Sequence, residues 1–439
     1  MHTGPARGMR DFLPEDVRRR QYVIDVVRRV YERYGFEPLE TPALENIETL
    51  TGKYGEEGNQ LIYKVLRRGE GAATGETDLA LRYDLTVPLA RVVADNRGKL
   101  PKFFKRYQIQ PVWRADRPAR GRFREFYQCD VDAIGSTSPV VEVEMIAAVS
   151  EVLQTLGFTD FVVQLNHRAL LTAILNSEGI PQSSHSEALI AIDKFDKIGR
   201  DGVIKDMVSR GIPAESAQGL LDTTQKAFEE LRTGFVTMDP GAAVAGENIG
   251  AIINLSESTP AAGHVKFTPR LARGLSYYTG AIMEIAVADL PGSLGGGGRY
   301  DGLIGMFSSE AIPACGFSLG LERILVVMGD RNMFPPDLTS GGVDVLVTIF
   351  DEPLTAESLT LAHELRAGGL RVEVYPEPLR NGKDLGKAFK YADARKARFV
   401  TVLGQDEAAG GTVKIKELAT GQQQSVARAA IVRALEPRT

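Results

Sequence analysis

Two consecutive stretches, FKRYQIQPVWRAD and RFREFYQCDVDAIG, most constrain what this chain can fold into. Both have the residue types of β-strands, and a short loop rich in Arg, Pro and Gly separates them. Their inner positions are polar where a core strand would be apolar. Gln128, Asp130 and Asp132 alternate along the second stretch, so a regular strand carries all three on one face. The pattern predicts a sheet with one strongly polar face.

The loop between these strands concentrates positive charge in a chain whose formal net charge is −5. Guanidinium groups bind phosphate oxygens through two parallel hydrogen bonds, and a carboxylate can hold an ammonium group. Arginines beside a face of carboxamides and carboxylates therefore suit a ligand with both a phosphate and an amine. A solvated charged loop explains the composition equally well, so both interpretations stay open. The arginines are Arg114, Arg117, Arg120, Arg122 and Arg124.

Two further segments place polar residues in surroundings that also have ordinary structural explanations. LRYDLTVPLAR puts Asp84 and Thr86 on one face of a predicted strand, although both residue types are common in turns and caps. LARGLSYYTG puts Arg273 four residues before the pair Tyr277 and Tyr278, beside a glycine that allows close approach of the backbone. A tyrosine pair is more often part of a core than of a ligand site.

A glycine-rich segment, GSLGGGGRYDG, contains Arg299, Tyr300 and Asp301. The chain has no GxxxxGK[ST] sequence, and no strand and helix flank this segment as a dinucleotide fingerprint requires. A flexible loop is one explanation, and a strand kept bare so that a flat ligand can lie on it is the other. Further along, GLERI places Glu322 and Arg323 at the start of an apolar helix, where a surface salt bridge would be ordinary.

The remaining composition narrows the class of protein. A chain of 439 residues predicts roughly two or three domains. Its apolar runs are shorter than the roughly 20 residues of a membrane helix, and its first residues lack the apolar core of a signal peptide. Cys129 and Cys315 form no CxxC pair, which predicts a protein of the reducing cytoplasm without disulfides. The absence of HExxH and GxSxG sequences leaves metalloprotease and serine hydrolase chemistry without support.

The order of the predicted elements divides the chain. A helix begins near Pro14, and residues from about 168 to 255 predict a helical insertion. The segment GFSLGLERILVVMG predicts a helix, and 331–342 a linker. From Val343 onward the β-α-β-α-β alternation predicts a separate α/β domain with a mostly parallel sheet, closed by a helix in SVARAAIVRAL.

Taken together and in this order, these segments resemble the histidyl-tRNA synthetases, and several of them are closest to the eukaryote-like branch of that family. FEPLETPALE resembles class II motif 1, 114–132 resembles motif 2 and GFSLGLERI resembles motif 3. LARGLSYY and GGGGRYDG resemble two segments of the histidine enzymes. The resemblance implies an α+β class II catalytic domain over 1–330, with an antiparallel sheet flanked by helices and the insertion at 168–255. It implies an α/β anticodon-binding domain over 343–439.

The resemblance also implies a histidine–tRNA ligase that uses ATP and Mg²⁺, acts on tRNA(His), forms a homodimer through motif 1 and works in the cytoplasm. It implies no metal site built by the protein alone. Catalysis would fall to Arg114, Arg273 and Arg323. ATP would contact Arg114, Asp116, Arg122, Phe126 and Arg323. Histidine would contact Asp84, Leu85, Thr86, Arg114, Gln128, Asp132, Arg273, Tyr277, Tyr278 and Tyr300.

One departure and two rival interpretations accompany the resemblance. The family usually reads RGLDYY where this chain reads RGLSYY, so Ser276 replaces a carboxylate that could orient Arg273. Paralogues that no longer aminoacylate act as histidine-sensing regulatory subunits of ATP phosphoribosyltransferase, but they usually lack the C-terminal domain and the catalytic arginines. A class II enzyme for threonine, proline or glycine would share motifs 2 and 3 but would not explain LARGLSYY with GGGGRYDG.

Overall fold

The computed structural model describes residues 3–226, 228–231, 234, 240–272, 277–338, 342–380 and 382–435. The chain divides into two compact units, Met1–Met333 and Phe334–Thr439. In the described residues no helix is both long enough and apolar enough to cross a bilayer.

An eight-stranded sheet forms the centre of the first unit. Its inner pairs are antiparallel, and the two outermost pairs are parallel, so the predicted antiparallel sheet is confirmed with parallel edges. In order across the sheet, the strands are β1 (Glu37–Pro38), β5 (Phe104–Trp113), β6 (Glu125–Ile134), β11 (Ala314–Gly320), β10 (Ser293–Arg299), β9 (Ala281–Ala286), β7 (Val162–His167) and β8 (Val265–Phe267).

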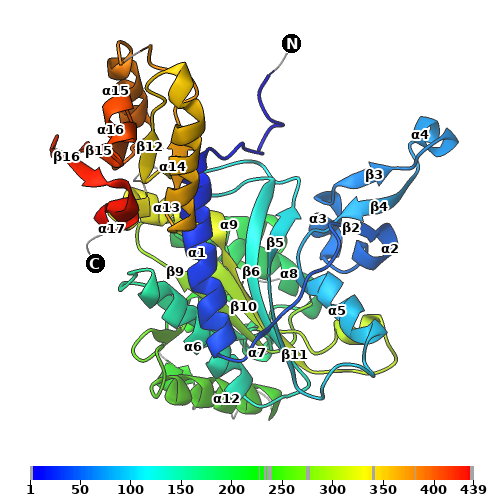
Figure 1. The fold of residues 1–439 in the computed structure, drawn as a ribbon. Helices are drawn as coiled ribbons and strands as arrows, with labels where there is room; N and C mark the ends of the chain where they lie inside the picture. Colours follow the sequence, from blue (N-terminus) through cyan, green and yellow to red (C-terminus); the bar gives the residue numbers. More distant parts are fainter. Residues whose placement is uncertain are drawn as a thin grey trace. The chain divides into compact units, whose positions relative to one another are not determined.

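Three helices cover one side of this sheet: α1 (Pro14–Arg33), α6 (Val140–Thr155) and α13 (Leu321–Asp330) (Figure 1). Five apolar residues of α1 recur at helical spacing and are buried, as the sequence pattern predicted: Val23, Val26, Val27, Val30 and Tyr31. Ile24 is only half-buried. Tyr31 of α1 donates a hydrogen bond of 3.2 Å to the carbonyl oxygen of Cys129 on β6. Because side chains alternate along a strand, covering this side leaves the neighbours of Cys129 on the opposite, polar side.

The polar side of the sheet is bordered by α5 (Thr86–Asp95) and a three-stranded sheet of β2 (Leu44–Asn46), β4 (Thr77–Leu81) and β3 (Lys64–Leu66). The prediction of a strand through Asp84 and Thr86 was therefore wrong. The carboxylate of Asp84 accepts a 3.0 Å hydrogen bond from the Val87 backbone N–H, which satisfies one donor in the first turn of α5. Pro88 also falls in that turn, where its missing N–H is not needed. The short helices α2 (Ile47–Leu50), α3 (Gly55–Gln60) and α4 (Glu70–Thr74) complete this border.

The glycine-rich segment forms strand β10, so the flexible-loop interpretation was wrong, and the binding of a flat ligand on this strand stays a prediction. Its glycines allow neighbouring backbones to approach closely. A Cβ at Gly297 would lie 2.2 Å from the carbonyl oxygen of Gly316, and one at Gly295 would lie 2.4 Å from that of Ser318. GFSLG was predicted as helix but forms β11, because it fills the gap between β10 and β6 in the sheet. The helix begins only at Leu321.

The segment predicted as a helical insertion contains α7 (Arg168–Ser177), α8 (His185–Ile192), α9 (Phe195–Ser209), α10 (Ala214–Thr223) and α12 (Pro240–Ser256). The first four pack around a small apolar core that includes Ile174, Val203 and Leu220.

The second unit is a five-stranded sheet with the order β13 (Val372–Val374), β12 (Val345–Val347), β14 (Phe399–Val402), β15 (Thr412–Glu417) and β16 (Gln423–Ala427). The first three strands are parallel and the last two are antiparallel, so the sheet is mixed rather than mostly parallel. SVARAAIVRAL was predicted as one helix, but its first residues belong to β16. The helix α17 covers only Ile431–Leu435. The other helices are α14 (Thr355–Ala367), α15 (Leu385–Ala394) and α16 (Gln405–Ala409).

Candidate active site

The floor of the candidate site is formed by β5, β6 and β11, whose side chains come into rows across the sheet. Asp132 on β6 lies opposite Arg106 of β5 and Gly316 of β11. Asp130 lies opposite Gln108 and Ser318 in the next row. The alternation predicted for the second strand is therefore present, and it is extended by polar residues of both neighbouring strands.

Asp132 is held by an arginine and a tyrosine. Its Oδ2 lies 2.7 Å from Nη2 of Arg106, and its Oδ1 accepts a short hydrogen bond from the hydroxyl of Tyr300. Arg106 is fully buried and also donates a 3.3 Å hydrogen bond to the carbonyl oxygen of Leu85. Burial raises the pKa of Asp132, and Arg106 and Tyr300 act in the opposite direction.

Asp84 is a second buried carboxylate at the same site. Its Oδ1 accepts a 2.9 Å hydrogen bond from the hydroxyl of Tyr54, and its Oδ2 accepts one of 3.1 Å from Tyr277. Burial raises the pKa of Asp84, while the hydrogen bond from Val87 and the charge of Arg114 lower it. The carboxylate is thus fixed between a helix N-terminus and two phenol groups.

Aromatic rings enclose the space beside these carboxylates. The ring centroids of Tyr277 and Tyr278 are 5.2 Å apart, and those of Tyr277 and Tyr300 are 5.9 Å apart, both edge to face. Gly298 of β10 lies next to this group, since a Cβ there would come within 3.0 Å of the Tyr278 ring. The segment LARGLSYY therefore meets the glycine-rich strand through Tyr278, and Tyr277 contacts Tyr300 directly after that strand.

Arg114 joins this carboxylate cluster to the arginine-rich loop. Its Nε donates a 2.9 Å hydrogen bond to the carbonyl oxygen of Tyr83, the residue before Asp84. Its guanidinium carbon lies 4.3 Å from the ring centroid of Tyr83 and 5.2 Å from that of Phe126. Phe126 is half-buried, so its ring offers a surface for stacking.

The other predicted phosphate-binding residues lie around the same loop. Nη2 of Arg122 is 2.8 Å from Oδ1 of Asp116. Arg323 donates a hydrogen bond to the carbonyl oxygen of Ser293. A Cβ at Gly121, in the turn of the loop, would lie 3.4 Å from Cγ of Arg323, so motif 3 and the loop meet here.

Gln128 and Thr86 complete the set of predicted residues that the structure describes. Nε2 of Gln128 donates a 2.9 Å hydrogen bond to the hydroxyl of Ser318, and Thr86 begins α5 directly after Leu85. Arg273 and Ser276 lie outside the described residues.

Two charged residues that the sequence singled out have structural roles. Glu322, expected in a surface salt bridge, is 3% exposed and accepts hydrogen bonds from Arg20 of α1 at 2.8 Å and from the Tyr127 backbone N–H at 3.0 Å. Arg299 points away from the polar floor. It forms two hydrogen bonds, of 2.7 and 2.8 Å, with the fully buried carboxylate of Glu142 on α6.

Sequence reasoning missed four residues of the site: Tyr54, Arg106, Asp130 as a binding group, and Ser318. Arg106 and Gln108 alternate in FKRYQIQ as the acidic residues do in the next strand, and this was the available signal. Tyr54 and Ser318 have no local signal, because only the tertiary fold brings them to the floor.

The arrangement suits one kind of ligand. Arginines and the half-buried ring of Phe126 lie on one side, and buried carboxylates, carboxamides and tyrosine hydroxyls lie on the other. A ligand with phosphate at one end and an amine at the other matches both sides. Within the described ranges, no cluster of three or more His, Cys, Asp and Glu side chains is placed to hold a metal ion.

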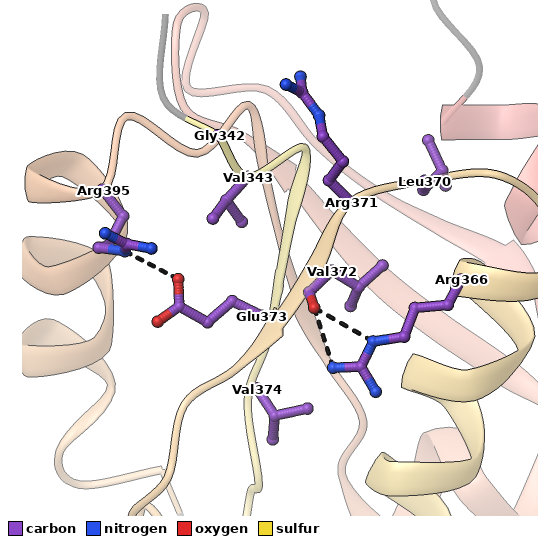
Figure 2. A pocket seen from close by; sticks show the side chains of 9 residues that line it. All are labelled: Gly342, Val343, Arg366, Leu370, Arg371, Val372, Glu373, Val374 and Arg395. Atoms are coloured by element: carbon purple, nitrogen blue, oxygen red, sulfur yellow. Dashed lines mark hydrogen bonds and ion pairs between the residues drawn. The ribbon is translucent and has the colours of Figure 1, made fainter. Parts of the chain in front are cut away.

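The second unit contains a separate, open hollow of about 530 Å³ beside the edge strand β13 (Figure 2). Arg366, Arg371 and Arg395 line it, and each has a partner within its own chain. Arg371 lies 2.8 Å from Asp344, Arg395 lies 2.8 Å from Glu373, and Arg366 donates to the carbonyl oxygen of Val372 at 2.9 Å. Any anion that binds here must compete with these contacts.

Comparisons with known proteins agree over nearly the whole chain. A sequence model described as histidyl-tRNA synthetase matches residues 8–324, and one described as an anticodon binding domain matches 344–438. A histidine–tRNA ligase of Cytophaga hutchinsonii is 39% identical, with 96% of each chain covered. One of Gloeobacter violaceus is 41% identical over the same shares. The crystal structure of histidyl-tRNA synthetase from Nostoc sp. PCC 7120 matches with a TM-score of 0.81 at 30% identity, covering 100% of both chains.

Proposed function

The chain belongs to the histidyl-tRNA synthetase family, and we propose that the site described above is where it activates histidine with ATP. Its function is that of a histidine–tRNA ligase, an aminoacyl-tRNA ligase. The position of Arg114 carries the site proposal. Arg114 lies between the arginine-rich loop, which is proposed to bind phosphate, and the carboxylate of Asp84.

Activation is the attack of the histidine carboxylate on the α-phosphorus of ATP, with pyrophosphate as the leaving group. Negative charge grows on the phosphate oxygens, and fixed guanidinium groups stabilise it without any proton transfer from a side chain. Arg114 and Arg323 take this role on opposite sides of the loop, and Arg273 is assigned to the same role by the family pattern. Phe126 stacks on adenine, and Asp116 positions Arg122 toward the nucleotide. Mg²⁺ enters bound to the ATP phosphates as part of the substrate.

Histidine lies across the polar floor in this proposal. Its ammonium group faces Asp84, Thr86 and Gln128. Its imidazole lies among Tyr277, Tyr278 and Tyr300, within reach of Asp132. Buried polar groups of this kind are left unpaired by an analogue that lacks the imidazole nitrogens, and such sites discriminate strongly without an editing domain.

The roles of the domains, the tRNA contacts, the oligomeric state and the location are proposed from the properties of the family. We assign residues 1–330 to the catalytic domain with the insertion at 168–255, 331–342 to a linker and 343–439 to anticodon binding. The tRNA(His) substrate would contact the second unit, and the sequence offers Arg380, Lys383, Lys387, Lys390, Arg395 and Lys396 as candidates. We also propose a homodimer formed through motif 1, and a cytoplasmic location, where tRNA and ATP are available.

The first test is amino-acid-dependent ATP–pyrophosphate exchange, with each of the common amino acids in turn. We expect exchange with histidine alone. Tight histidine binding without exchange would instead support the regulatory-subunit interpretation, and exchange with another amino acid would overturn the histidine site. The experiment also tests whether the chain tolerates Ser276 where the family has Asp.

Gly316 offers a sharper test of the histidine side of the site. A Cβ at this position would lie 1.9 Å from Oδ1 of Asp132 and 3.2 Å from the Tyr300 ring. We expect Gly316→Ala to displace the Asp132 carboxylate and raise the KM for histidine by about tenfold or more, as expected when a charged hydrogen bond is lost. The KM for ATP should stay within about twofold. Gly329→Ala, on α13 with open space around it, is the matched control and should change neither constant. An unchanged histidine KM in Gly316→Ala would contradict the assignment of Asp132.

A further inference from the structure

Asp130 has a position in the site but no role in the reaction as described so far. It lies on β6 between Gln128 and Asp132, on the polar face, and is 1% exposed. Its Oδ1 and the Oε1 of Gln128 are buried and accept no hydrogen bond from the residues that the structure describes. The same holds for Oε1 of Gln108 and Oδ2 of Asp132, and the Nε and Nη1 groups of Arg106 donate none, so the floor has more polar groups than its own side chains satisfy. Buried polar atoms are nearly always hydrogen-bonded, so two neighbouring acceptors without donors point to a ligand that brings donors.

The charges around Asp130 do not balance within the protein. Asp84, Asp130 and Asp132 are all buried, and Arg106 is the buried cation between the last two. Nη2 of Arg106 is 2.7 Å from Asp132 but 4.0 Å from Asp130. Arg106 therefore pairs with Asp132. A buried carboxylate without a close counter-charge is unfavourable unless a cation or a proton joins it.

The environment of Asp130 decides between these two partners. Burial raises the pKa of Asp130 to about 7, the charge of Arg106 acts against the rise, and Asp132 adds to it. Ser318 on β11 donates to the carboxylate and also favours its charged form. The charged or titratable groups that face it are Arg106 from β5, Asp132 from β6, Asp84 from the turn before α5, Tyr278 from the segment before β9 and, through the sheet, Tyr31 from α1.

We propose that Asp130 is a further substrate-positioning residue, which holds a proton in the empty site and releases it when its carboxylate binds the α-ammonium group of histidine. This inference rests on the histidine-activating function proposed above. The step balances as a protonated Asp130 and an ammonium ion giving a carboxylate–ammonium pair and one proton in solvent. Asp130 shares the floor with Gln128, the amide that faces the same ammonium group, so one cation satisfies both orphaned acceptors.

The protonation of Asp130 makes histidine binding depend on pH in one direction. The pKa of Asp130 is about 7 in the empty site and falls when a cation is bound. Histidine binding is therefore accompanied by proton release. It strengthens as the pH rises through about 7 and becomes independent of this group once Asp130 is already ionised.

The test is calorimetric titration of L-histidine into the full chain, repeated in buffers with small and large enthalpies of ionisation. At pH 7 we expect Asp130 to contribute about half a proton per histidine. This contribution is the difference between the wild type and Asp130→Asn, because the imidazole of free histidine, with a pKa of about 6.5, also exchanges protons on binding. The contribution should fall toward zero by about pH 8.5. In Asp130→Asn the part of the release that Asp130 supplies should disappear, and the histidine affinity at pH 8 should fall by about tenfold. The exposed-site control Asp95→Asn should behave as the wild type.

One result would overturn the role of Asp130: an Asp130→Asn variant that releases as many protons per histidine as the wild type between about pH 6.5 and 7.5. An unchanged KM for ATP shows that the variant has folded, and Asp130→Ser, which also lacks the carboxylate, takes its place if Asp130→Asn does not fold. Pyrophosphate exchange is measured on the same samples. If the wild type shows no histidine-dependent exchange, the proposed function itself is overturned. If it shows exchange but no proton release that depends on Asp130, only the role of Asp130 is overturned.

Discussion

Replacing Arg114 by alanine is expected to reduce kcat/KM for histidine-dependent pyrophosphate exchange by about a thousandfold, the effect of removing a main stabiliser of transition-state charge. The guanidinium is held by the Tyr83 carbonyl and by the rings of Tyr83 and Phe126, so its orientation is already fixed. Preorganised donors act mainly in the transition state, so most of the loss should fall on kcat.

Two variants, Arg114→Lys and Arg117→Ala, provide the controls. Arg114→Lys keeps the charge but loses the planar pair of donors, and we expect it to recover only a small part of the activity. Arg117 lies on the same loop and is exposed, so Arg117→Ala should leave pyrophosphate exchange within about threefold of the wild type. Similar losses in Arg114→Ala and Arg117→Ala would show that the loop acts only through its overall charge.

Replacing Arg299 by methionine is expected to lower the free energy of unfolding of the first unit by about 3–5 kcal/mol, because it leaves the carboxylate of Glu142 buried without a partner. Arg299 is 7% exposed and Glu142 is fully buried, and a third hydrogen bond of 2.9 Å joins Arg299 to the carbonyl oxygen of Ser136. In a unit of this size the change corresponds to a fall in Tm of roughly 5–15 °C.

Thermal unfolding followed by circular dichroism measures this loss, and a double variant separates the pair from the packing. Arg299→Met with Glu142→Gln removes both charges and should recover part of the stability. Arg331→Met breaks an exposed pair with Asp160 and Asp289 and should shift Tm by only a few degrees. If Arg299→Met unfolds at the same temperature as the wild type, the buried pair contributes nothing to the stability of the unit.

The parts of the fold that follow from local pattern were predictable from the sequence. The helix α1 and the strands β5 and β6 have clear periods, and the alternation of Gln128, Asp130 and Asp132 is enough by itself to locate the polar face of the sheet. Elements whose state is fixed by their neighbours were not predictable in this way. GFSLG is a strand because β6 and β10 hydrogen-bond to both of its edges. The helix after Asp84 had a local signal instead, since the Asp84 carboxylate accepts from the N–H of Val87 three residues on.

The site shows the same division. The residue types of the arginine-rich loop were enough to mark it as a candidate site. They could not show that Arg299 pairs with Glu142 on the helix-covered side of the sheet, whereas Arg114 lies at the site. The pairing of Arg106 with Asp132 depends on the register of two strands, and Tyr54 reaches Asp84 from a separate segment. Roles of this kind become visible only when partners distant in sequence have been placed.

Glu322 joins α1, β6 and α13 in the core, one residue before Arg323. Its partner Arg20 is 302 positions away in the chain. A substitution of one residue alone leaves the charge of the other buried without a partner. Substitutions at the two positions are therefore expected to occur together during evolution. Among natural relatives the two positions should therefore vary together: where Glu322 is kept, Arg20 is kept, and where one becomes neutral, the other follows.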